Sequence, residues 1–265
     1  MPVSMAALAE DLAAETAVLR ALLVGLDEPG WGRDTPAAGW TIADQVSHLA
    51  HFDDVALQAA TDPEAFVAAR AGIEAEGGID PDRIAESYRH LSGAELLDRF
   101  DRSRARLVET FAAFDPGTRV PWFGPPMSVA SSLTARIMET WAHGQDVADT
   151  VGVERAPTAR LRHVAHIGVG ARAYSYVVNG LEAPRTPVRV ELRAPDGSTW
   201  TWGPDDAAGR IAGDALDFCL AVTQRRHLDD VHLTADGPIA REWMSIAQAY
   251  AGAAGTGRAP RGVRS

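Results

Sequence analysis

Apolar residues recur at intervals of three and four along the first half of the chain, which is the spacing of helices that bury one face. The leucines of residues 5–26 follow this spacing. The same pattern predicts helices over residues 41–60, with a restart at 62–63, and over residues 92–114 and 128–150. Four long helices with shorter connections indicate a four-helix bundle, a fold whose interior often holds metal ions.

Two of these helices begin with a recognisable capping sequence. Thr41 stands three residues before Asp44, and Ser92 stands three residues before Glu95. In this arrangement the hydroxyl accepts a hydrogen bond from a backbone amide of the first turn, and the acid favours the positive end of the helix. The segment at residues 27–39 is rich in Gly and Pro and is predicted to be a loop.

The pattern changes in the second half of the chain. Residues 158–178 still have a helical spacing, whereas residues 187–202 alternate around a Pro-Asp-Gly turn, which predicts a β-hairpin. Two more helices are expected over residues 214–226 and 238–251. Helices followed by a small mixed unit indicate the α+β class.

The chain has 265 residues, of which 46% are hydrophobic and 23% are charged, as in folded globular proteins. This length accommodates two modest cores. We therefore predict a helical domain over residues 1–153, a small α+β domain over residues 154–252 and a flexible tail over residues 253–265.

The net charge, the cysteine content and the N-terminal sequence each exclude some properties of the protein. The formal net charge of -11 disfavours binding to nucleic acid and to anionic membranes. The single cysteine, Cys219, excludes an internal disulfide, and its apolar surroundings predict a packing role. The first 23 residues contain several charges and lack the features of a signal peptide, so the cytoplasm is the expected location.

The predicted helix over residues 128–150 carries Glu139 and His143, four residues apart. This spacing places both side chains on one helix face, one turn apart. His48 lies between apolar positions of the helix over residues 41–60 and is expected to face the bundle interior. Two imidazoles and one carboxylate leave a coordination position open, which is typical of catalytic zinc sites. By spacing alone, the alternative is a solvated Glu–His pair, with His48 as a core histidine.

The segment GWTIADQVSHL, residues 39–49, together with Glu139, His143 and Asp146, resembles the N-terminal domain of mycothiol-dependent maleylpyruvate isomerases. These enzymes belong to the DinB-like group of metal-binding four-helix bundles. The resemblance covers about the first 150 residues, and it implies that His48, Glu139 and His143 bind one divalent metal ion. It also implies a small C-terminal α/β domain of the sterol-carrier-like kind.

Two histidines and one carboxylate suit zinc. The resemblance further implies a low-molecular-weight thiol such as mycothiol as co-substrate, since a metal lowers the pKa of a bound thiol. Asp146 is a candidate acceptor that fixes the tautomer of a ligand imidazole, or else an exposed helical acid. The family has a glycine before a functional arginine near its last helix, where this sequence has Gln224 and Arg225. Arg225 is thus a candidate for holding a substrate carboxylate, or a surface group near a helix end.

Three functions remain open at this point. The first is a metal-dependent thiol transferase or isomerase that acts on a small electrophile, and the second is a non-catalytic protein that binds a metal and an apolar ligand. The third is a hydrolase that uses metal-activated water. His51 is an alternative ligand, and Trp40, Trp122 and Trp141 are candidates either for the wall of the site or for packing. Nickel, iron or manganese could use the same ligands, and the oligomeric state is open.

Overall fold

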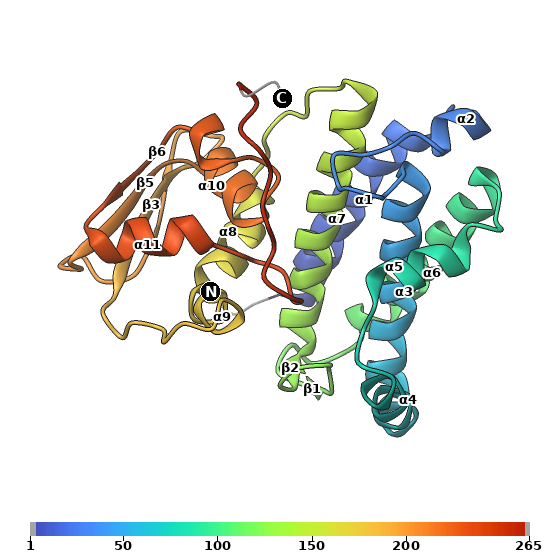
Figure 1. The fold of residues 1–265 in the computed structure, drawn as a ribbon. Helices are drawn as coiled ribbons and strands as arrows, with labels where there is room; N and C mark the ends of the chain where they lie inside the picture. Colours follow the sequence, from blue (N-terminus) through green and yellow to red (C-terminus); the bar gives the residue numbers. More distant parts are fainter. Residues whose placement is uncertain (1–3, 263–265) are drawn as a thin grey trace. The chain divides into compact units, whose positions relative to one another are not determined.

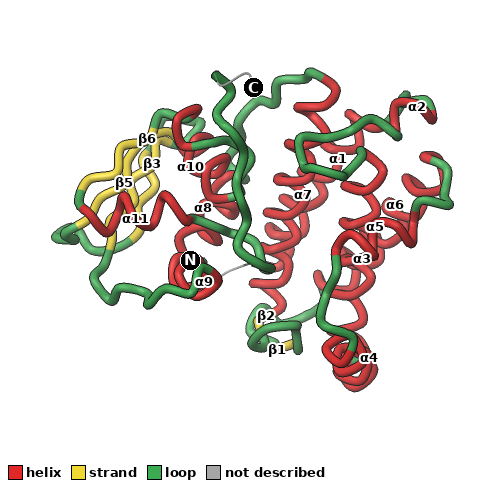
Figure 2. Tube along the Cα trace, in the orientation of Figure 1, coloured by secondary structure: helices red, strands yellow, loops and turns green. Residues whose placement is uncertain are grey.

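The structure, a computed structural model, describes residues 4–262. The chain divides into two compact units, unit 1 over residues 1–155 and unit 2 over residues 156–265. Unit 1 contains the long helices and unit 2 contains a small sheet with helices (Figures 1 and 2). The predicted α+β class is therefore confirmed. No helix within residues 4–262 has the length and apolar composition needed to cross a bilayer.

Unit 1 is built on four long helices: α1 (Met5–Leu23), α3 (Ile42–Thr61), α6 (Gly93–Ala112) and α7 (Val129–Val151). Helix α1 packs against α6 and α7, and α3 packs against the same two helices, so the four close around a common core. Each helix lies within a few residues of the range that its apolar spacing predicts. The four-helix bundle is confirmed.

Three shorter helices connect the bundle helices: α2 (Glu28–Trp31), α4 (Pro63–Ala75) and α5 (Pro81–Tyr88). Helix α4 is the predicted restart, whereas α2 lies in a segment predicted to be a loop. The Asp27 carboxylate accepts a hydrogen bond from the Gly30 amide at 2.9 Å, and this cap stabilises one turn despite the Gly and Pro content. Helix α5 was not predicted; Asp80 caps it, and Pro81 occupies its first position.

The capping sequences begin α3 and α6 as predicted. The Asp44 amide donates to the Thr41 hydroxyl at 3.3 Å, and the Thr41 amide donates to the Asp44 carboxylate at 2.9 Å. Ser92 and Glu95 form the same reciprocal pair at the start of α6. A short ribbon of β1 (Arg119–Val120) and β2 (Met127–Ser128) precedes α7. These local signals fix where the helices that carry the site begin.

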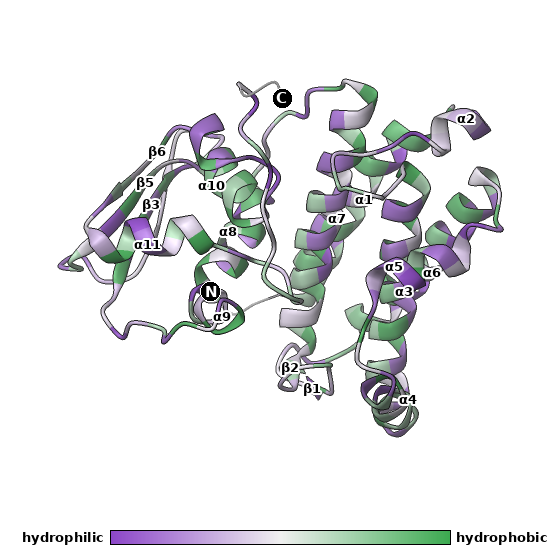
Figure 3. Cartoon of the chain, in the orientation of Figure 1, coloured by the Kyte–Doolittle hydropathy of each residue, from purple (hydrophilic) through white to green (hydrophobic). Residues whose placement is uncertain are grey.

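A layer of polar side chains divides the core of unit 1. One apolar cluster includes Leu12, Ala56, Leu107 and Ile137, and a second cluster includes Leu19, Leu49, Phe100 and Val147. Along each bundle helix a buried polar residue lies between its two clusters, namely Thr16, Asp53, Arg104 and Thr140. Hydrophilic and hydrophobic residues accordingly alternate along these helices (Figure 3).

The charged side chains of this layer form hydrogen bonds and ion pairs with one another. Arg104 donates to the Asp53 carboxylate through Nε at 2.7 Å and Nη2 at 3.3 Å, and to the Thr16 hydroxyl through Nη1 at 2.5 Å. Nη1 of Arg136 lies 4.0 Å from Oδ1 of Asp53. Asp53 is fully buried, and both arginines are at most 5% exposed. A buried charge without a partner is costly, so Asp53 of α3 must stay close to Arg104 of α6 and Arg136 of α7. This requirement holds the three helices together.

Unit 2 contains a four-stranded sheet made of β3 (Val188–Arg193), β4 (Thr199–Trp202), β5 (Gly209–Asp214) and β6 (Leu233–Asp236). The strand order is β4-β3-β5-β6. Strands β3 and β4 form the predicted antiparallel hairpin, whereas β5 lies parallel to β3 and β6 lies antiparallel to β5. Strands β5 and β6 were not predicted, because they contain few β-branched or aromatic residues.

The helices of unit 2 are α8 (Leu161–Gly170), α9 (Arg172–Val178), α10 (Ala215–Val222) and α11 (Pro238–Ile246), with a 3₁₀ turn at Leu228–Asp230. The helix predicted over residues 158–178 is thus interrupted at Ala171. Cys219 is fully buried on α10, and burial raises its thiol pKa, as suits a packing residue. In the predicted tail, Gln248 hydrogen-bonds to the backbone of residues 253 and 255, and residues 263–265 lie outside the described residues.

The buried ion pair leads to a prediction about stability. Asp53→Asn removes the carboxylate charge and leaves Arg104 and Arg136 buried without it, so the free energy of unfolding should fall by about 3 to 5 kcal/mol. Urea denaturation followed by circular dichroism measures this loss. Asp101→Asn is the matched control: it breaks the exposed pair with Arg20 between α1 and α6 and should cost less than about 1 kcal/mol. Equal losses in both variants would contradict the role given to Asp53.

Candidate metal centre

Three side chains from two helices of unit 1 converge on one point. Glu139 and His143 lie one turn apart on α7, and His48 reaches them from α3. Nε2 of His143 lies 3.2 Å from Oε2 of Glu139, and Nε2 of His48 lies 3.9 Å from the same oxygen. One ligand atom from each residue lies within 4.8 Å of the other two. The structure thus brings together the three residues that the sequence singles out.

These distances suit a metal ion. Zinc binds imidazole nitrogen and carboxylate oxygen at about 2.0 to 2.2 Å, so in a tetrahedral site the ligand atoms lie roughly 3.4 Å apart. The contacts of 3.2 and 3.9 Å bracket that spacing. The three side chains keep 10 to 16% of their surface exposed, so the cluster is sheltered without being sealed. Two nitrogens and one oxygen leave room for an exogenous ligand.

A chain of hydrogen bonds determines which nitrogen of His143 carries the proton. The Thr35 hydroxyl donates to the Trp40 carbonyl at 2.8 Å, and its oxygen accepts from the Gln45 amide nitrogen, also at 2.8 Å. The amide oxygen of Gln45 therefore faces Nδ1 of His143, at 2.5 Å. Because an amide oxygen only accepts, Nδ1 carries the proton and Nε2 directs its lone pair toward Glu139.

The protonation states also suit metal binding. Burial, together with the neighbouring His143, lowers the pKa of His48 well below its ordinary value, so His48 is neutral at pH 7. Burial raises the pKa of Glu139, but the neighbouring His143 and Arg136 outweigh it and hold this pKa well below its usual range. The site therefore offers a carboxylate and a neutral imidazole, the forms that ligate cations.

Aromatic rings enclose the cluster. The Trp40 ring lies 5.4 Å from the His48 ring and is stacked on the His143 ring at 6.0 Å, measured between centroids. The Phe52 ring lies 4.6 Å from the His48 ring. Apolar walls limit the access of water and strengthen electrostatic interactions inside the site. Of the three tryptophans considered from the sequence, Trp40 borders the cluster, whereas Trp122 stacks on Phe66 at 6.0 Å, a packing contact.

Other candidate residues have different surroundings. His51 directs Nδ1 toward the Tyr88 hydroxyl at 3.2 Å instead of toward Glu139. Asp146 is fully buried on α7, but the partner of the His143 ring is Gln45, so the acceptor role of Asp146 stays a prediction. The sequence analysis missed Gln45. Its position three residues before His48, on the same helix, is the signal that could have revealed it.

Arg225 lies in unit 2, where Nη1 donates to the Thr223 carbonyl at 2.7 Å, and its role toward a substrate stays a prediction. The preceding residue, Gln224, has a φ of 57°, a left-handed conformation that favours glycine. Its side chain compensates by donating to the Ala247 carbonyl at 3.2 Å and accepting from the Tyr250 hydroxyl at 2.5 Å. The turn before Arg225 therefore has a glycine-like backbone although the glycine is absent.

Comparison with known proteins gives matches to both halves of the chain. Residues 12–148 match the family described as the mycothiol maleylpyruvate isomerase N-terminal domain, a range that includes all three clustered residues. Residues 184–236 match the family described as wyosine base formation.

Two relatives from Mycobacterium tuberculosis, strains CDC 1551 / Oshkosh and ATCC 25618 / H37Rv, are described as uncharacterized proteins. Each is 49% identical over 248 residues, which covers 94% of this chain and 96% of the relative. Among solved structures, the crystal structure of the mycothiol-dependent maleylpyruvate isomerase and that of a histidine-to-alanine mutant are similar, each with a TM-score of 0.59 and 16% identity. The match covers 88% of this chain and 93% of each solved chain. At this identity the likeness shows a shared fold.

The hydrogen-bond chain leads to a prediction about the His143 tautomer. Gln45→Leu removes the acceptor at Nδ1, so the metal-free variant should show a mixture of tautomers where the parent shows protonation at Nδ1. Long-range ¹H–¹⁵N correlation spectra of the histidine rings measure this change. Gln145→Leu is the matched control, because Gln145 also lies on α7 and donates to Asp149 at 2.9 Å instead of contacting the ring. A parent protonated at Nε2 would refute the assignment.

Proposed function

Because the chain belongs to the mycothiol maleylpyruvate isomerase N-terminal domain family, we propose that it is a metal-dependent enzyme that transfers or uses a low-molecular-weight thiol. In this proposal His48, Glu139 and His143 hold one divalent ion, and zinc suits their donor set best. The co-substrate is mycothiol or a similar thiol, and the substrate is a small electrophile that is isomerised or modified. Because thiol chemistry needs a reducing compartment, the proposal includes a cytoplasmic location.

One observation supports this proposal above the others. Nε2 atoms of two histidines face the same Glu139 oxygen, at 3.2 and 3.9 Å, in a sheltered site whose protonation states already suit a cation. A surface ion pair would not need the Gln45 contact that fixes the His143 proton. The arrangement therefore favours metal binding over the alternative of a solvated pair.

In this proposal the residues around the site have separate roles. A bound divalent ion supplies Lewis acidity, which lowers the pKa of a thiol or water molecule that coordinates to it. Gln45 keeps the His143 proton on Nδ1 and so leaves Nε2 available as a ligand. Trp40 and Phe52 shield the site from bulk water. In the proposal Arg225 holds a carboxylate of the substrate, and Asp146 supports the ligand histidines from within α7.

The first test of this proposal is the metal content of protein purified without an affinity tag. The parent should contain close to one divalent ion per chain by elemental analysis, and His48→Ala and His143→Ala should lose most of it. His90→Ala is the matched control, because His90 is exposed and its Nδ1 lies 2.9 Å from the Ser87 carbonyl, away from Glu139. Gln45→Leu should lower the affinity roughly 10- to 100-fold. Metal-free parent protein that takes up no added zinc would refute the metal site.

The second test distinguishes thiol chemistry from the other functions. Cobalt-substituted protein should develop a sulfur-to-metal charge-transfer band when mycothiol is added, and none with S-methylated mycothiol, which lacks the ionisable proton. Ester or amide turnover without any thiol would instead indicate a hydrolase. A metal-loaded protein that shows neither a band nor turnover would indicate the non-catalytic binding protein.

A further inference from the structure

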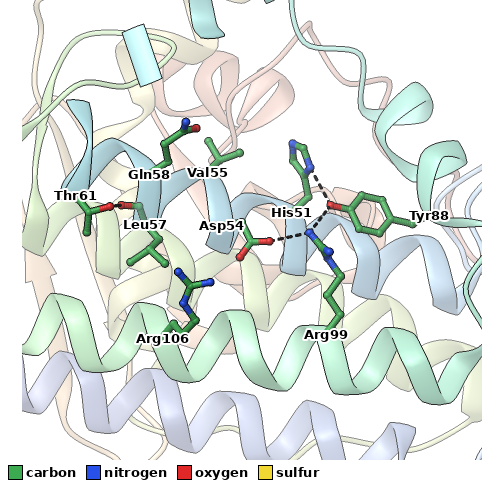
Figure 4. A pocket seen from close by; sticks show the side chains of 9 residues that line it. All are labelled: His51, Asp54, Val55, Leu57, Gln58, Thr61, Tyr88, Arg99 and Arg106. Carbon is green, nitrogen blue, oxygen red and sulfur yellow. Dashed lines mark hydrogen bonds and ion pairs between the residues drawn. The ribbon is translucent and has the colours of Figure 1, made fainter. Parts of the chain in front are cut away.

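Unit 1 also has a polar hollow near the cluster of His48, Glu139 and His143, which we call the metal cluster. The hollow is formed by other residues. Its volume is about 670 Å³, and it lies where α3, α5 and α6 meet. Figure 4 shows Arg99 and Arg106 extending from α6 toward α3, which contributes His51, Asp54 and Gln58. Tyr88 of α5 lies at one end of the hollow, beside His51. None of these residues belongs to the metal cluster.

At the Tyr88 end of the hollow, three polar side chains are connected by hydrogen bonds. Nη2 of Arg99 donates to the Tyr88 oxygen at 3.4 Å, and that hydroxyl lies 3.2 Å from Nδ1 of His51. Burial raises the pKa of Tyr88 and lowers that of His51, so both are neutral at pH 7. Arg99, Tyr88 and His51 therefore form one connected group of polar side chains at this end of the hollow.

The charges of the hollow are not balanced. Arg99 forms an ion pair with Asp54 at 2.9 Å, so the charges of these two side chains cancel. Arg106 is exposed and, within residues 4–262, makes neither an ion pair nor a hydrogen bond through its guanidinium. Nε of Arg99 is buried and also lacks a hydrogen-bond acceptor among the described residues. The hollow therefore has an excess positive charge and unused donors on a chain whose net charge is -11.

We propose that this hollow is a binding site for a small organic anion, with Arg106 as the main contact of its carboxylate or phosphate group. A guanidinium offers two parallel donors to such a group. The Arg99–Tyr88–His51 end contacts polar groups on the rest of the ligand, and Val55 and Leu57 provide apolar surface beside them. The inference does not depend on metal binding, since the hollow shares no residue with the metal cluster.

The hollow is physically linked to the metal cluster. His51 follows His48 by one turn of α3, and the Phe52 ring contacts both imidazoles, at centroid distances of 5.1 and 4.6 Å. An anion bound in the hollow would therefore lie one aromatic ring away from a metal ligand.

Titration of the full-length, chelator-treated protein with simple anions tests the proposal. Succinate and inorganic phosphate are added separately at constant ionic strength, and arginine Nε–H signals are followed by NMR. We expect saturable binding of at least one anion, with a shifted Arg99 signal, and binding about tenfold or more weaker in Arg106→Gln, because a charge-assisted hydrogen bond is lost. The anion that binds more tightly identifies carboxylate or phosphate as the preferred group.

Arg102→Gln is the matched control, since Arg102 lies one turn from Arg106 on α6 and pairs with Asp98 on the exposed surface. Its affinity should equal that of the parent. Equal weakening in both variants would show a general charge effect and overturn the site, as would the absence of saturation with either anion. Because the protein in this assay carries no metal, these outcomes are independent of whether the metal proposal holds.

Discussion

The buried polar layer across the bundle is the feature on which the rest of unit 1 depends. Asp53, Arg104 and Arg136 bring charges out of water, which is tolerable only where opposite charges meet at close range. Apolar contacts allow a helix to slide with modest repacking, whereas this network does not. It therefore fixes α3 against α6 and α7. His48 and Glu139 depend on that register, because a displacement of one turn would separate the residues that meet on these helices.

A second constraint comes from the loop before α3. Thr35 and the Trp40 carbonyl belong to this loop, and they orient the Gln45 amide, whose oxygen then meets His143. The capping box at Thr41 fixes the point at which the loop becomes helix. One short stretch thus supplies the start of the helix, the aromatic wall and the tautomer control.

Helix α3 serves two sites at once. Its His48 belongs to the cluster with Glu139 and His143, and His51 and Asp54 line the hollow between α3 and α6. The Phe52 ring contacts both of these histidines, His48 and His51. If both sites bind their ligands as proposed, an enzyme acting on a small electrophile has an adjacent positive hollow that favours anionic molecules, in a protein whose overall charge would repel them.

The sequence by itself determined the long helices and the hairpin, because their signals are local: apolar spacing, the caps at Thr41 and Ser92, and the Pro-Asp-Gly turn. It also predicted that Glu139 and His143 share a helix face and that His48 faces the bundle interior, and the resemblance implied that these three residues bind one metal ion. Tertiary structure alone decided the pairing of β5 and β6, the roles of Gln45 and Asp53, and the hollow lined by Arg106. These features join residues that are between 10 and about 100 positions apart and belong to different elements. The pattern of residues within one segment does not specify which distant side chains will contact it. These contacts could therefore be identified only in the folded structure.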